Sequence, residues 1–306
     1  MTMKWAGVMP AITTGFDTEL NVDHPFVAKH CNWLVDNGCT GIVTPGSLGE
    51  GATLTFQEKL DLWSTVIDAV GSRVPVVAAI AALSTREATD LAVEASRRGC
   101  RGLMVLPPYV YRSDWREMKA HIQAVFRATE LSCMLYNNPV AYGTDFLPEQ
   151  IEELVSEHDN FNAVKESSTD VRRVTAIKAL VGERLSILVG VDDAIVESIG
   201  MGACGWVAGL VNALPKESVD LFNYAMSGEH ERALKLYNWF LPMLRMDTVP
   251  KFVQLIKLVQ QEVGMGSVRV RPPRMELVGT ELDEALRTIR EALENRLDFQ
   301  TTAQVA

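Results

Sequence analysis

The chain has 306 residues, of which 47% are hydrophobic and 22% are charged, so a packed core is expected and a disordered chain is not. Its net charge of −10 argues against a protein that binds nucleic-acid phosphates or an anionic membrane. Apolar runs stay well short of the roughly 18 residues that a membrane span requires. The N-terminus reads as a strand, so a signal peptide is not expected.

Short apolar runs alternate along the chain with segments whose apolar residues lie three and four positions apart. Nearly continuous apolar runs are typical of strands buried on both faces, and the intervening periodicity is typical of helices. The predicted strands are 6–13, 40–45, 74–80, 101–108, 132–137, 161–166, 185–190 and 205–210. Helices are predicted, among others, over 26–34, 56–70, 85–96, 115–126 and 171–180. Eight equal units in about 220 residues predict an α/β fold, a closed (β/α)8 TIM barrel, rather than an open sheet.

Glycines end several of the predicted helices, and the alternation stops after the eighth strand. Strands 2, 4 and 8 are preceded by DNGCTGIV, RRGCRGLMV and GMGACGWVAG, where we expect left-handed glycine caps. From about residue 215 the chain reads as helices, interrupted by RVRPPRMELVG. We therefore expect the barrel core over 1–214, with the last barrel helix and a C-terminal helical extension over 215–306.

Cysteines and histidines show no metal-binding or disulfide pattern. The five cysteines lack CxxC spacing and most have apolar neighbours, so we expect buried thiols in a reduced, cytoplasmic protein. The five histidines are scattered, without an HxH or HExxH pattern. Because a P-loop and a dinucleotide fingerprint are also missing, we expect neither a metal nor a cofactor.

Polar residues follow three predicted strands at the end of a barrel where active sites form. Lys165 closes strand 6 in VKESS, where partial desolvation lowers a lysine pKa and frees the amine to attack a carbonyl. The alternatives are a lysine that extends to solvent or one that pairs with Glu166. Tyr136 closes strand 5 in YNNP and would act as a proton shuttle for a lysine at the carboxyl end of the barrel. Glycines around Ser47 and Leu48 in GSLGE allow successive amides to face one carboxylate.

The ends of strands 7 and 8 should complete the pocket. Asp192 and Asp193 follow strand 7 and disfavour a phosphorylated substrate, since two carboxylates repel phosphate. For Asp193 the sequence allows a helix N-cap or the recognition of a substrate hydroxyl. Ser167 lies two residues after Lys165 and therefore faces the same way along the strand.

GSLGE, YNNP and VKESS, in this order and spacing, resemble the motifs of the dihydrodipicolinate synthase/N-acetylneuraminate lyase superfamily of Schiff-base class I lyases, over about residues 5–295. The resemblance implies that Lys165 forms an imine with a 2-oxo acid and that Tyr136 and Ser47 pass protons. It also implies that the Ser47 and Leu48 amides hold the substrate carboxylate, that Glu50 supports their loop, and that the protein is a tetramer built from dimers. The expected substrate-binding residues are Gly46, Ser47, Leu48, Tyr111, Tyr142, Ser167, Asp193 and Val207.

Two positions depart from the synthase itself. Val110 stands where the synthase has a tyrosine supplied by a neighbouring subunit, and Tyr109 or Tyr111 is available to replace it. Ala141 stands where the synthase has an arginine that grips the carboxylate of its second substrate. These departures make a role in lysine biosynthesis doubtful.

We therefore expect a catabolic enzyme that forms a lysine imine with a small 2-oxo acid or its cyclic imine and breaks a neighbouring bond. Aldol cleavage, dehydration and deamination remain open. Tyr142, Trp206 and Val110 suggest a compact pocket with few cations, which favours a 1-pyrroline-4-hydroxy-2-carboxylate deaminase of hydroxyproline breakdown or a 4-hydroxy-2-oxoglutarate aldolase. The alternatives are dihydrodipicolinate synthase, a 2-keto-3-deoxy sugar acid aldolase or dehydratase, a metal-dependent aldolase, and a non-catalytic barrel that binds a small molecule.

Overall fold

Parallel strands form one eight-stranded sheet in the computed structural model, which describes residues 3–109 and 111–297. The order along the sheet is β1-β8-β7-β6-β5-β4-β3-β2. The two outer strands join because Ala11 forms a parallel bridge with Val43, whose amide donates to the Pro10 carbonyl at 2.9 Å. The predicted TIM barrel is therefore confirmed. The strands are β1 (Gly7–Val8), β2 (Ile42–Thr44), β3 (Val76–Ile80), β4 (Gly102–Val105), β5 (Ser132–Asn137), β6 (Phe161–Glu166), β7 (Ser186–Val189) and β8 (Gly205–Trp206).

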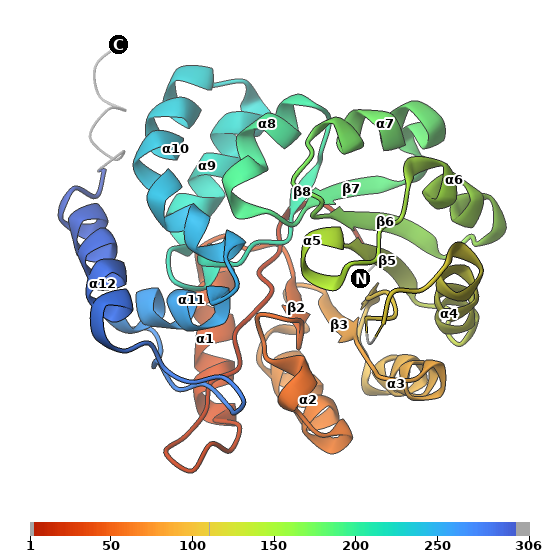
Figure 1. The fold of residues 1–306 in the computed structure, drawn as a ribbon, viewed down its shortest axis with the longest axis horizontal. Coiled ribbons are helices and arrows are strands. Elements are labelled where there is room, and N and C mark those ends of the chain that lie inside the picture. The colour runs from red at the N-terminus through yellow and green to blue at the C-terminus, as the bar shows by residue number, and fades with distance from the viewer. Residues whose placement is uncertain (1–2, 110, 298–306) are drawn as a thin grey trace.

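Helices follow the strands and surround the barrel (Figure 1). The barrel helices are α1 (His24–Asp36), α2 (Phe56–Val70), α3 (Thr85–Arg98), α4 (Trp115–Arg127), α5 (Pro139–Tyr142), α6 (Pro148–Glu157), α7 (Arg172–Val181), α8 (Ile195–Gly200) and α9 (Pro215–Ser227). The C-terminal extension contains α10 (His230–Leu244), α11 (Phe252–Glu262) and α12 (Gly279–Glu294), which gather on one side of the barrel in Figure 1. Among the residues that the structure describes, no helix is long and apolar enough to cross a bilayer.

Local sequence signals explain where several of these elements start and stop. Thr55 begins α2 with a capping box, in which its hydroxyl accepts from the Glu58 amide. Gly38 and Gly99 have φ of 96° and Gly202 has φ of 105°, so each of the predicted glycines adopts the left-handed conformation after its helix. The first and last strands are shorter than predicted, because each leaves the ladder after two residues.

Side chains alternate along the strands between the barrel interior and the layer under the helices. On β6, Ala163 belongs to the interior cluster and Val164 to the outer one. Lys165 follows with Ala163's orientation and so rises at the carboxyl end of the interior. The residues beneath it are apolar: Met9, Val43, Val77, Ala79, Met104, Met134 and Leu188. This packing places the Lys165 amine above a layer of buried apolar side chains.

Candidate active site

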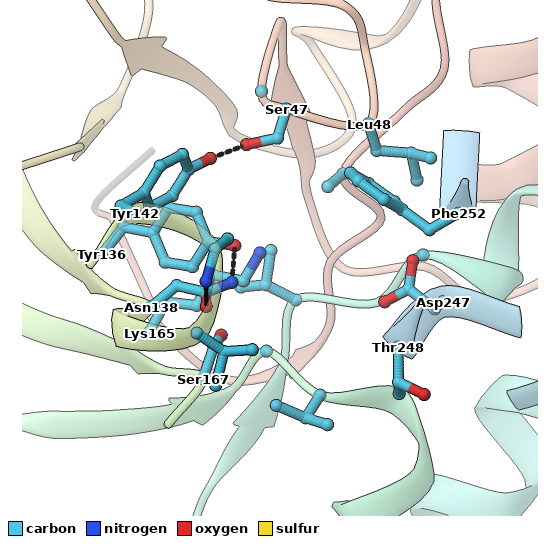
Figure 2. Close-up of a pocket in the computed structure, with 18 of the residues that line it drawn as sticks. Ser47, Leu48, Tyr136, Asn138, Tyr142, Lys165, Ser167, Asp247, Thr248 and Phe252 are labelled. Carbon is cyan, nitrogen blue, oxygen red and sulfur yellow. Dashed lines mark hydrogen bonds between the residues drawn. The ribbon is translucent and has the colours of Figure 1, made fainter. Parts of the chain in front are cut away.

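A cavity of about 460 Å³ opens at the carboxyl ends of the strands (Figure 2). The barrel contributes the loops after β2, β5, β6, β7 and β8, and the C-terminal extension covers the other side. The cavity brings together most of the residues predicted from the sequence. These are Gly46, Ser47, Leu48, Tyr136, Tyr142, Lys165, Ser167 and Val207.

Lys165 is the buried amine of this cavity. Its side chain is 6% exposed, and its Nζ lies 4.1 Å from the centroid of the Tyr136 ring. Burial lowers the Lys165 pKa to about 8, although the nearby carboxylates of Asp247 and Asp192 act in the opposite direction. The Glu166 carboxylate turns away and accepts from the Ser168 amide at 2.7 Å. The amine therefore neither extends to solvent nor pairs with Glu166.

Gly190, at the end of β7, leaves the space that Lys165 occupies. A Cβ built on Gly190 would lie 2.3 Å from Lys165 Cε and 2.0 Å from Ser167 Oγ. Both distances are shorter than any tolerable non-bonded contact. The lysine is thus held between the Tyr136 ring on one side and a bare backbone on the other.

Two phenols meet beside the amine. The Tyr136 hydroxyl accepts from Asn138 Nδ2 at 2.9 Å, and burial raises the Tyr136 pKa to about 12. The Tyr142 ring packs edge-on against Tyr136 with centroids 5.8 Å apart, and its hydroxyl hydrogen-bonds to Ser47 Oγ. Burial also raises the Tyr142 pKa. At neutral pH both phenols keep their protons, so both are potential proton donors.

The loop after β2 lines the cavity and contains two backbone amides without an acceptor in the part of the chain that the structure describes. Within the described residues, no group accepts a hydrogen bond from the Ser47 or Leu48 amide. The loop is held by Glu50, which is 1% exposed and accepts from Lys257 Nζ at 2.6 Å and from the Arg271 amide at 2.9 Å. Free amides on a fixed turn are suited to a carboxylate.

The aspartates after β7 interact with other parts of the chain and do not line the cavity. Asp192 is fully buried and accepts from Trp206 Nε1 at 3.0 Å and from the Leu210 amide at 2.7 Å, so it fixes the turn after β8. The N-cap interpretation of Asp193 is wrong, because Ala194 occupies that position and no side chain caps α8. Asp193 instead pairs with Arg245 at 3.6 Å and does not line the cavity.

Other expected pocket residues lie elsewhere. Trp206 is 0% exposed and belongs to the outer core, because it points away from the barrel interior that its neighbour Val207 faces. Tyr111 is 55% exposed and lies outside the cavity lining, on a loop that leaves the barrel after β4. Val110 lies outside the described residues. Tyr109 is closer, with its ring centroid 5.9 Å from that of Tyr142.

The C-terminal extension supplies two ionisable residues that sequence reasoning missed. Asp247 and Arg274 both line the cavity, and neither follows a strand. Burial, together with the nearby Asp192, raises the Asp247 pKa well above its usual value. Arg274 adds a cation to a pocket that was expected to have few. Among the described residues, no three His, Cys, Asp or Glu side chains come together as a possible metal site.

Comparisons with known proteins settle the family. The sequence profile of the Dihydrodipicolinate synthetase family matches residues 4–292. The chain belongs to this family. It is 31% identical over 281 residues to a 4-hydroxy-tetrahydrodipicolinate synthase of Desulforudis audaxviator, covering 91% of this chain and 93% of that protein. It is 28% identical over 271 residues to the corresponding synthase of Methanocaldococcus jannaschii, covering 89% and 93%.

The fold comparison agrees with the family. The crystal structure of a dihydrodipicolinate synthase from Bacillus anthracis superimposes with a TM-score of 0.90 and 27% identity, covering 97% of this chain and 100% of that one. The protein is accordingly a Schiff-base lyase of the dihydrodipicolinate synthetase family.

Proposed function

We propose that the protein is a class I lyase in which Lys165 forms an imine with a small 2-oxo acid or its cyclic imine. The observation that carries this proposal is the state of the Lys165 amine, which is buried in the cavity and has a pKa of about 8. About a tenth of such an amine is neutral at pH 7 and able to attack a carbonyl. A barrel that only binds a small molecule has no need of a nucleophilic amine.

The surrounding groups match the steps of imine formation. The substrate carboxylate binds the free amides of Ser47 and Leu48, and this contact brings the C2 carbon of the substrate to Lys165. Attack gives a carbinolamine, and Tyr136 gives its proton to the hydroxyl that leaves as water. Asn138 Nδ2, 2.9 Å from the Tyr136 oxygen, stabilises the phenolate that remains. The phenolate then takes a proton from C3 of the imine, which yields an enamine.

The substrate that we favour carries a hydroxyl on C4, as in 1-pyrroline-4-hydroxy-2-carboxylate and 4-hydroxy-2-oxoglutarate. Ala141 lines the cavity where a synthase would hold an arginine for its second substrate. A cavity of about 460 Å³ suits an acid of this size. A cyclic imine also suits Lys165, since transimination exchanges one C=N bond for another.

The second candidate is 4-hydroxy-tetrahydrodipicolinate synthesis. Two observations favour it: the relatives carry this name, and Arg274 brings to the cavity a cation that Ala141 does not provide. A charge at Arg274 would serve the carboxylate of a second substrate.

The test compares three reactions on one enzyme preparation. Ammonia is measured with 1-pyrroline-4-hydroxy-2-carboxylate, pyruvate with 4-hydroxy-2-oxoglutarate, and condensation with pyruvate plus aspartate semialdehyde. We expect turnover of a hydroxylated substrate to exceed condensation by at least about 30-fold, the effect of one lost ion-pair partner at about 2 kcal/mol. Condensation as fast as the other two reactions would refute the preference.

A further inference from the structure

The Asp247 carboxyl faces the reacting amine from the extension side of the pocket. It lies in the 3-10 turn Arg245–Thr248 between α10 and α11, and Figure 2 shows it across the cavity from Tyr136 and Tyr142. The turn after β8 makes room for it, since a Cβ on Gly209 would lie 2.1 Å from Asp247 Oδ1. Two distant parts of the chain thus combine to present this carboxyl to the substrate space.

Asp247 differs from the two carboxylates beside it in having no fixed partner. Asp192 accepts from one indole and two backbone amides, and Asp193 pairs with Arg245. Within the part of the chain that the structure describes, no group hydrogen-bonds or ion-pairs with the Asp247 carboxyl. Burial and the charges of Asp192 and Asp193 raise its pKa well above the ordinary range, while Lys165 acts in the opposite direction. The pKa shift therefore favours the protonated form of this carboxyl, in which it can give a proton to a group in the cavity.

We infer that Asp247 is the acid that protonates a leaving hydroxyl on C4 of the Lys165-bound substrate, so that the enzyme eliminates water instead of cleaving the C3–C4 bond. This inference rests on the proposed function, because it begins from the enamine.

The step balances without an oxidant or a reductant. The enamine nitrogen re-forms the C2=N bond, the C2=C3 electron pair moves to C3=C4, and the C4–O bond breaks with its electrons going to oxygen. That oxygen takes the Asp247 proton and leaves as water, and Asp247 later recovers a proton from solvent. Aldol cleavage would need the reverse, a base that removes the proton from the C4 hydroxyl, whereas an unpaired, buried carboxyl opposite the tyrosines is better suited to donate a proton.

With the cyclic substrate, elimination ends in ammonia. Transimination by Lys165 opens the ring and leaves the ring nitrogen as an amine on C5. After water is lost, proton shifts convert this amine to an imine at C5, and two water molecules release ammonia and the lysine. Ammonia formation therefore reports the elimination, whereas pyruvate formation from 4-hydroxy-2-oxoglutarate reports aldol cleavage.

The experiment is Asp247→Asn, which keeps the shape of the side chain and removes its acidic proton. Two rates are measured on the variant: trapping of pyruvate with borohydride, and ammonia release from 1-pyrroline-4-hydroxy-2-carboxylate. We expect trapping within about threefold of wild type and ammonia release reduced at least about 100-fold, the usual contribution of a general acid. Asp220→Asn is the matched control, because Asp220 pairs with Lys216 on α9, away from the cavity, and should change neither rate.

A second variant and a pH profile separate an acid from a structural carboxyl. Gly209→Ala should displace the Asp247 carboxyl. Ammonia release should then fall as it does in Asp247→Asn, while pyruvate trapping persists. Wild-type ammonia release should fall at high pH as Asp247 ionises, and this fall should vanish in Asp247→Asn. The titratable groups that interact electrostatically with Asp247 are Asp192, Asp193, Lys165 and Tyr136, and Arg274 lines the same cavity. All of them stay unchanged in that variant.

Several results would overturn the inference. Ammonia release at the wild-type rate in Asp247→Asn would remove the acid role, and loss of pyruvate trapping in that variant would make Asp247 a partner of Lys165 instead. A wild-type enzyme that releases pyruvate but neither ammonia nor an unsaturated acid would show aldol cleavage. In each case wild-type trapping still supports the imine, whereas its absence would refute the proposed function itself.

Discussion

Gly190→Ala should displace the Lys165 amine and slow its reaction, although Lys165 itself is not mutated. The added Cβ would lie 2.3 Å from Lys165 Cε, 2.8 Å from Lys165 Cγ and 2.0 Å from Ser167 Oγ. All three atoms belong to side chains that can turn aside, and the Gly190 backbone adopts a conformation open to alanine. The amide that donates to the Glu166 carbonyl at 2.9 Å is retained. The fold should therefore survive while the amine moves.

The size of the displacement sets the expected loss. Carbon atoms in contact lie at about 3.5–4.0 Å, so Lys165 Cε must move by more than about 1 Å. Misplacing a reacting group by about 1 Å costs on the order of 100-fold in rate. We expect borohydride trapping of pyruvate to slow by about this factor, with little change in the urea midpoint.

Gly200→Ala is the matched control. Nothing lies within 4 Å of a Cβ at Gly200, which ends α8 far from the lysine. This variant should trap pyruvate at the wild-type rate. Trapping by Gly190→Ala at that same rate would refute the argument that the bare backbone of Gly190 positions Lys165.

The remaining predictions concern pH, stability and metals. Because burial lowers the Lys165 pKa to about 8, pyruvate trapping should rise roughly tenfold per pH unit below pH 8 as the amine loses its proton, and level off above it; a flat rate would contradict the lowered pKa. Lys257→Met leaves the buried Glu50 charge unpaired and should lower the free energy of unfolding by about 3–5 kcal/mol. Lys251→Met, which breaks only the half-exposed pair with Glu281, should cost less than about 1 kcal/mol, and equal losses in urea melts would refute this difference. Dialysis against EDTA should leave turnover unchanged, and a loss reversed by one added divalent ion would count against the imine mechanism.

The barrel and the central residues of its site could be predicted because they follow from strand topology. Runs of buried apolar residues locate the strands, and all parallel strands of a barrel end at the same rim. Lys165, Tyr136 and Ser47 each stand at or just after a strand end, so their meeting in one cavity follows from their sequence positions.

The rest of the site depends on distances that the sequence pattern does not encode. Asp247 and Arg274 come from the extension, and only its packing over the barrel brings them to the cavity. Trp206 was wrongly expected in the pocket because neighbouring residues of a strand point to opposite faces of the sheet. Val207 faces the barrel interior, so Trp206 faces the helices. Asp193 was misjudged because a 3-10 turn precedes α8, which moves the cap position to Ala194.

Reductive trapping at Lys165 tests the central claim most directly. The protein is incubated with pyruvate and borohydride, its intact mass is measured by mass spectrometry, and it is then digested to locate the modified peptide. The account predicts one pyruvate adduct per chain, on the peptide that contains Lys165, and none in Lys165→Ala. A wild-type protein without an adduct, or an adduct that persists in Lys165→Ala, would contradict it.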